Sequence, residues 1–162
     1  MKKISFAISV LALTAMAQAE TPAQAAFSKI KGLVGTWKGQ FSGSEFEVNY
    51  KLIGSGSAIV ETQFPGTATE MVTVYHMDNG KLVLTHYCAA GNQPSLKFVP
   101  GKDSNRIDFK FHHGSNMKLS DSHMHDLTIV FKGPDEVVSV WKGWDKGKLG
   151  HTAKFELTRQ SK

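Results

Sequence analysis

Histidine has the widest chemical range of the residue types in this 162-residue sequence, and its seven copies are unevenly distributed. Three of them suggest a metal site, because His113 precedes a polar loop and His123 and His125 follow it. Residues two apart on a strand share a face, so His123 and His125 could bind one transition-metal ion together with His113 across a hairpin. A His-x-His pair without a fixed carboxylate partner is more often part of a solvated loop, and both interpretations stay open.

A second pair, His86 and Cys88, has the residue types of a nucleophilic site. A cationic imidazole near a thiol favours the reactive thiolate. The sequence offers no acidic partner, oxyanion loop or nucleophile elbow to go with this pair. We therefore expect a binding protein rather than an enzyme, and keep a cofactor-free reaction at His86 and Cys88 as an alternative.

Strands must position these residues, because most of the chain alternates apolar and polar residues. Phe46, Val48, Tyr50 and Leu52, for example, are separated by polar residues, a pattern that buries one face of a strand and exposes the other. Turn signals such as Asn79-Gly80 separate these runs. The pattern predicts ten strands, at 35–41, 45–53, 57–64, 69–77, 81–88, 95–99, 105–112, 123–132, 136–144 and 149–159.

A short helix is predicted before the first strand. Thr21 is a suitable N-cap, Pro22 suits the first helical position, and apolar residues recur at helical spacing from Phe27 to Val34, so the helix should end near Gly32 or Gly35. No later helix is long enough for a parallel crossover, so neighbouring strands should pair antiparallel, and ring closure would remove exposed edges. The predicted fold is all-β: a ten-stranded antiparallel up-and-down β-barrel with a short N-terminal helix, forming one domain over residues 20–162.

A meander of this kind sorts residues between the two ends of the barrel, because each strand reverses direction. All histidines except His76 fall at one end. If Asn79-Gly80 is a two-residue turn, Thr73 faces His86 and Met71 faces Cys88, on the same strand face as Tyr75. We take that uncharged face as the interior.

The last strands add two further residues to this interior. His151 shares the parity of Ala153 and Phe155, and a three-residue turn at Asp145 would place it beside Trp141. An apolar cup with a few polar groups at its mouth is the usual form of a small-ligand site. We predict that the cup holds an apolar or amphipathic small molecule, with a filled barrel interior as the alternative. The predicted lining is Thr73, Tyr75, His86, Cys88, Trp141 and His151.

The N-terminus has the features of a secretory signal. Lys2 and Lys3 precede an apolar stretch, and Ala17-Gln18-Ala19 is a small-x-small cleavage site, so residues 1–19 are predicted to be removed. Removal lowers the formal charge from +5 to +3, because 17 of the 19 basic residues and all 14 acidic residues then remain. A charge of +3 without a basic run argues against nucleic-acid binding, and no apolar run suggests a membrane span. We expect a periplasmic or secreted protein whose single Cys88 forms no internal disulfide.

Two sequence patterns resemble known families. The segment Gly35-Thr36-Trp37-Lys38-Gly39, with Arg159 near the end of the chain, resembles the opening and closing strands of calycins, the lipocalin and fatty-acid-binding-protein group, and in particular nitrobindin-type ten-stranded barrels. The segment from Thr85 to Pro94, with His123-Met124-His125 and Asp145-Lys146-Gly147-Lys148, is similar to secreted bacterial lipocalin-like proteins of unknown function.

The nitrobindin resemblance implies a packing contact and a cofactor. It implies that Arg159 packs over Trp37 at one end of the barrel. It also implies haem binding through a histidine on the last strands. His151 lies in the matching strand and is the candidate for this role. Haem or a transition metal at the histidine-rich end is therefore the alternative to a small organic ligand.

Overall fold

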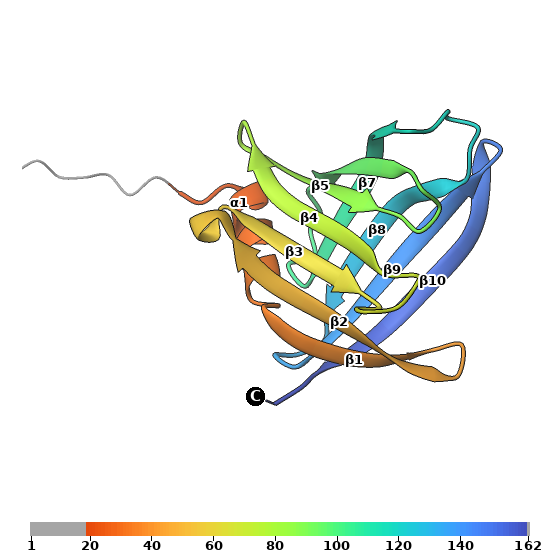
Figure 1. The fold of residues 1–162 in the computed structure, drawn as a ribbon. Coiled ribbons are helices and arrows are strands. Elements are labelled where there is room, and N and C mark those ends of the chain that lie inside the picture. Colours follow the sequence, from red (N-terminus) through yellow and green to blue (C-terminus); the bar gives the residue numbers. More distant parts are fainter. Residues whose placement is uncertain (1–18, 162) are drawn as a thin grey trace, which may run out of the picture.

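The structure is a computed structural model that describes residues 19–161. The predicted signal peptide, apart from Ala19, lies outside these residues. One helix precedes a series of strands joined by short turns, with a single 3₁₀ turn, η1, at Gly54–Gly56 (Figure 1). The elements are α1 Pro22–Lys31, β1 Gly35–Phe41, β2 Ser44–Ile53, β3 Ala58–Gln63, β4 Met71–Asp78, β5 Lys81–Tyr87, β6 Gln93–Val99, β7 Arg106–Ser115, β8 His123–Phe131, β9 Glu136–Asp145 and β10 Lys148–Arg159.

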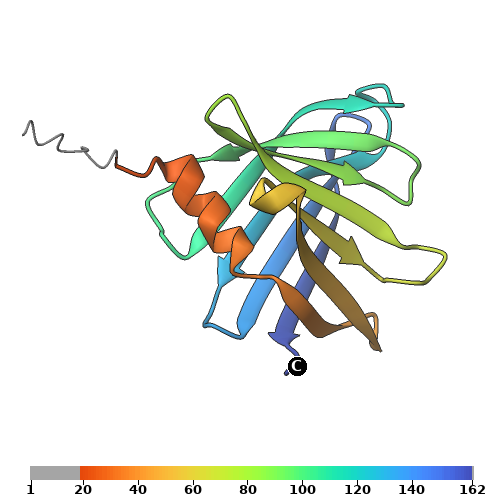
Figure 2. The ribbon, with the colours of Figure 1, turned by 60° about the vertical axis from the view of Figure 1, so that its left-hand side comes forward.

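The helix begins and packs as the sequence predicts. Thr21 forms a capping box with Gln24, Pro22 occupies the first turn, and Gly32 follows the last residue of α1. Its buried face consists of Ala26, Phe27 and Ile30. This face lies across one end of the barrel (Figure 2), so α1 closes that end with apolar side chains.

The ten strands form a closed antiparallel barrel, which confirms the predicted fold class. Each strand pairs with its neighbours in sequence, and β1 pairs with β10 to complete the ring. Each of the ten strands therefore has partners on both sides, and the part of the chain that the structure describes leaves no sheet edge open. Within residues 19–161, no helix has the length and apolar character needed to cross a membrane.

Trp37 and Arg159 meet at the seam between β1 and β10. They are register partners, and the Arg159 guanidinium lies 4.3 Å from the centre of the Trp37 ring. Arg159 also donates to the carbonyl oxygens of Val34 and Gly32, at 2.9 and 2.8 Å, and to the carboxylate of Asp135. This contact agrees with the one that the calycin resemblance implies, and it fastens the closing strands to the segment that follows α1.

The predicted pairing of β4 with β5 is confirmed where both strands are regular. Thr73 pairs with His86 and Tyr75 pairs with Leu84. The expected pairing of Met71 with Cys88 is absent, because β5 ends at Tyr87 and Cys88 starts a turn in which its amide bonds to Asn92.

The predicted neighbour of His151 is also different. The turn between β9 and β10 has two residues rather than three, and a bulge follows between Leu149 and Thr152. Trp141 consequently pairs with Ala153. His151 lies instead over Gly143, because the shorter turn and the bulge together move the pairing by two residues along β9.

Candidate functional site

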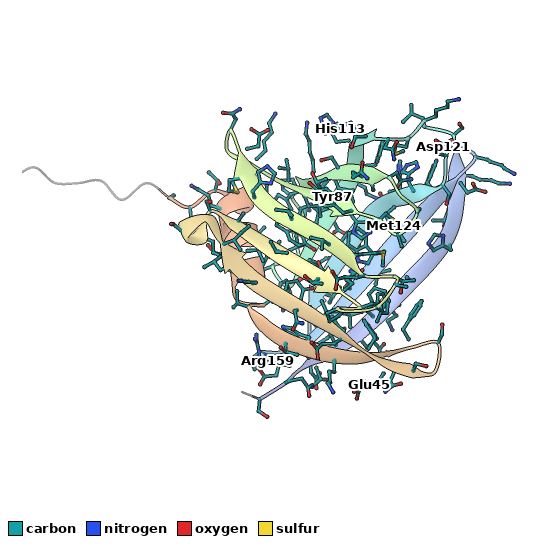
Figure 3. The ribbon with its side chains drawn as sticks, in the orientation of Figure 1. Glu45, Tyr87, His113, Asp121, Met124 and Arg159 are labelled. Carbon is teal, nitrogen blue, oxygen red and sulfur yellow. The ribbon has the colours of Figure 1, made fainter. Side chains whose placement is uncertain are left out.

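A pocket of about 150 Å³ opens inside the barrel at the end opposite α1. The strand β1 runs from the helix-closed end at Gly35 to Phe41 at the pocket, and Figure 3 shows Met124 of the pocket well separated from Arg159 at the closed end. Most of the lining is apolar or aromatic. The lining residues are Phe41, Gln63, Phe64, Met71, His86, Met124, Trp141, His151, Ala153 and Phe155.

Three phenylalanines, Phe41 of β1, Phe155 of β10 and Phe64 just after β3, form one wall of the pocket. Phe41 contacts Phe155 edge to face at 5.2 Å, and Phe64 stacks on Phe46 at 4.9 Å between ring centroids. Phe46 in turn packs against Phe155. Offset and edge-to-face aromatic pairs stabilise one another, so this wall is a fixed apolar surface for a ligand.

His86 lies in the pocket lining and is 1% exposed. Its Nδ1 is 2.9 Å from the hydroxyl of Thr73, and its Nε2 is buried without a hydrogen-bond partner among the described residues. Burial lowers the pKa of His86 to about 4, because a charged imidazole is poorly solvated here. At neutral pH the side chain is therefore uncharged, with one ring nitrogen available.

Trp141 lies against His86 in the same lining. The two ring centroids are 4.6 Å apart, and Trp141 is 1% exposed. Its indole Nε1 is also buried without a partner within residues 19–161. A buried polar group without a partner costs about 1–3 kcal/mol, so two such nitrogens on adjacent rings of one pocket identify it as the candidate site.

A row of polar residues continues from His86 across the barrel interior. Successive register pairs link His86 to Thr73, Thr73 to Glu61, and Glu61 to Tyr50. Glu61 is buried and accepts hydrogen bonds from the Tyr75 hydroxyl and from Gln63 Nε2. Burial raises the pKa of Glu61, and the hydrogen bonds from Tyr75 and Gln63 oppose that change.

Two residues predicted to contact the ligand instead belong to this polar row or bond to it. Thr73 and Tyr75 are fully buried, and neither lines the pocket. Thr73 instead holds His86, and Tyr75 holds Glu61. Gln63, which the sequence analysis did not single out, lines the pocket and connects it to Glu61.

Glu61 itself was missed because either face of its strand could be the interior. Ile59, Glu61 and Gln63 alternate with Ala58, Val60 and Thr62, so both faces contain apolar and polar residues. The pairing of Glu61 with Tyr50 is the signal that shows which face of the strand is the interior.

His151 lies in the pocket lining and is exposed, which places it at the mouth. A side-chain carbon on Gly143 would lie 2.4 Å from His151 Cε1, so the imidazole occupies the space over that glycine. Cys88, in contrast, is half-buried in the turn after β5 and does not line the pocket. The structure therefore brings His86, Trp141 and His151 together but not Cys88.

The three predicted metal ligands are divided between two places. His123 Nε2 lies 3.1 Å from His125 Nδ1, and the His125 ring stacks between Phe111 and Trp144. His113 packs against His112 instead. Within residues 19–161, no group of three or more histidine, cysteine or acidic side chains is placed to hold a metal ion.

A larger hollow lies on the outer surface over β1, β2 and β10. It has a volume of about 560 Å³ and is lined by Lys38, Glu45, Lys154 and Glu156 among others. These side chains form exposed ion pairs with one another. Exposed pairs of this kind are common on soluble surfaces and give no reason to expect a specific ligand.

Haem does not fit the interior pocket. A dry apolar cavity of about 150 Å³ holds a molecule of benzene size, whereas a porphyrin contains four pyrrole rings. The pocket volume is also below the roughly 300–1,000 Å³ of most cofactor sites. The role of His151 as a haem ligand therefore stays a prediction from the resemblance alone.

Comparison with known proteins gives no assignment: no family model matches the chain, and a search of curated proteins finds no relative. The fold and the pocket must therefore support any functional conclusion by themselves.

Proposed function

We propose that the protein binds a small, mainly apolar molecule with one polar group in the pocket between Phe155 and His86. The observation that carries the proposal is the pair of unpartnered ring nitrogens, His86 Nε2 and Trp141 Nε1, in an otherwise apolar lining. Apolar walls supply affinity by removing ligand surface from water, and a few polar atoms fix its orientation.

The size and charge of the pocket narrow the choice of ligand. A volume of about 150 Å³ suits a single ring or a short branched chain. Among residues 19–161, the pocket lining includes no lysine, arginine, aspartate or glutamate. An ion transferred into such a site would lose its hydration without gaining a countercharge, so the expected ligand is uncharged.

We further propose that the protein is a calycin-like barrel with a histidine at its mouth. The closed ten-strand meander and the stacking of Arg159 on Trp37 support the first point. The exposed position of His151 in the pocket lining supports the second.

Toluene tests the binding proposal directly. Titration into ¹⁵N-labelled protein should shift the Trp141 indole signal in a saturable way. Ala153→Leu places extra volume opposite Trp141 and should abolish the shift, whereas Ala58→Leu, on β3 outside the pocket, should leave it intact. Far-ultraviolet circular dichroism checks that both variants fold. If neither toluene nor phenol, a ring of similar size with one polar group, gives a saturable shift in the wild-type protein, the interior is effectively filled and the proposal is wrong.

Export is the remaining part of the proposed function. Lys2, Lys3 and the Ala17-Gln18-Ala19 site support removal of residues 1–19 and action in the periplasm or outside the cell. The expected intact mass of the exported protein corresponds to a chain that starts at Glu20. Protein found only in the cytoplasm with Met1 retained would contradict this.

A further inference from the structure

The hydrogen-bond partner of Thr73 indicates which nitrogen of His86 carries the proton. Among the described residues, His86 Nδ1 is the one side-chain partner of the Thr73 hydroxyl. If the hydroxyl donates to Nδ1, only the proton on Nε2 lacks a partner. If Nδ1 carried the proton, both the hydroxyl hydrogen and the Nε2 lone pair would be left unpaired. Because each unpaired buried group is costly, the first arrangement is favoured and Nε2 is a donor.

Trp141 offers a second donor beside it. The indole nitrogen can only donate, and it is buried without a partner within residues 19–161. The rings of His86 and Trp141 are 4.6 Å apart at their centroids with 38° between their planes. Both rings line the pocket, so its wall contains two neighbouring N–H groups, each without an acceptor among the described residues.

We infer that the pocket selects an uncharged carbonyl compound whose oxygen accepts hydrogen bonds from both His86 and Trp141. A carbonyl oxygen has two lone pairs and can serve two donors at once. A hydrocarbon would leave both donors unpaired, and a carboxylate would bring a charge into a lining to which the described residues contribute no cation. The inference rests on the proposed ligand-binding function and specifies the chemical class of the ligand.

A matched pair of probes tests this inference. Cyclohexanone and methylenecyclohexane have nearly the same size and shape. They differ at one position, where the ketone has an oxygen atom and the hydrocarbon has a CH₂ group. Calorimetric titration of the wild-type protein gives the ratio of their dissociation constants, which measures carbonyl preference. Cyclohexanecarboxylate, the charged comparator, should bind more weakly than the ketone. A carboxylate that binds more tightly than the ketone would overturn the inference in favour of an anion site.

Trp141→Phe removes one donor and keeps an aromatic ring. The ketone-to-hydrocarbon preference should fall by about three- to tenfold, the value of one neutral hydrogen bond. A change in pocket shape would affect both probes and largely cancel in the ratio. An unchanged ratio in this variant overturns the carbonyl inference while hydrocarbon binding still supports the pocket. If neither probe binds the wild-type protein, the proposed function fails as well.

Thr73→Val tests the positioning role of Thr73 without touching the pocket lining. In the wild-type protein, ¹⁵N spectra of the His86 ring should show the proton on Nε2, and its signal should move with that of the Trp141 indole when cyclohexanone is added. Removing the hydroxyl should release the ring from this tautomer and lower the ketone preference. A wild-type ring protonated on Nδ1 would overturn the inference, because Nε2 would then be an acceptor.

Discussion

The imidazole of His151 lies over Gly143, in the space that a side chain at position 143 would fill. Gly143 is buried on β9, and His151 is exposed on β10 at the pocket mouth. A carbon atom on Gly143 would lie 2.4 Å from Cε1 and 2.6 Å from Nδ1 of the imidazole, closer than real contacts allow. The missing side chain on one strand thus sets the position of the ring on the next.

Gly143→Ala should destabilise the protein through His151. We expect a loss of about 1 kcal/mol in the free energy of unfolding, typical of mild overpacking. In a His151→Ala background the same change should cost nothing, because the crowded ring is gone. Urea denaturation of the wild type, the two single variants and the double variant measures the coupling. Gly133→Ala is the control, because a Cβ atom added at Gly133 would have no described atom within 4 Å. Equal costs in both backgrounds would show that the two residues are independent.

Arg159→Lys should weaken the seam of the barrel. Lysine keeps the charge but cannot stack flat on Trp37 while donating to both Gly32 and Val34. We expect a loss of about 2 kcal/mol in the free energy of unfolding, as for lost hydrogen bonds from a charged group. Arg106→Lys is the matched control, because Arg106 pairs with Asp108 at the surface and should cost about 1 kcal/mol or less. Similar losses in the two variants would contradict a special role for the seam.

Glu61→Gln should change how stability depends on pH. Burial raises the pKa of Glu61 above its ordinary 4.5. The folded protein therefore retains a proton that the unfolded chain has lost, and this stabilising contribution disappears as pH rises through the raised pKa. The variant should become more stable relative to the wild type as pH rises above 4.5. Urea denaturation at pH 4 to 8 measures the difference, and a difference independent of pH would rule this out.

His86 should act in the opposite direction. Its pKa in the folded protein is about 4, against an ordinary 6.5. As pH falls from 6.5 towards 4, the unfolded chain takes up a proton that the folded protein excludes, so the wild type loses up to about 3 kcal/mol of stability. His86→Gln should remove that part of the acid sensitivity. Cyclohexanone affinity should stay constant between pH 5 and 8, and a drop in affinity centred near pH 6.5 would show that His86 is solvated.

The barrel could be predicted from sequence because its determinants are local. Period-two alternation marks the strands, and the Asn79-Gly80 turn fixes the register that pairs Thr73 with His86. His151 could be assigned to the interior by parity, whereas Trp141 was placed beside it through a three-residue turn that the structure does not have. Their actual neighbours across the hairpin could not be predicted, because the bulge between Leu149 and Thr152 leaves no clear mark in the sequence.

The interior was harder to predict than the strands. The strand that contains Glu61 has apolar residues on both faces. Only the pairing of Glu61 with Tyr50 between β3 and β2 therefore reveals that Glu61 is buried. The absence of partners for His86 Nε2 and Trp141 Nε1 depends on every side chain around them. Such properties emerge from packing across several strands, which alternation along one strand does not encode.

The pairing of β1 with β10 has a consequence for how the chain folds. Every other strand pair joins neighbours in sequence, whereas the Arg159 bond to Val34 spans 125 residues. Nine hairpin-like contacts can therefore form early and locally, while ring closure must wait for the two ends of the chain to meet. We expect a curled open sheet to precede the barrel during folding. On the ribosome, β1 would lack its second partner until the last strand has emerged.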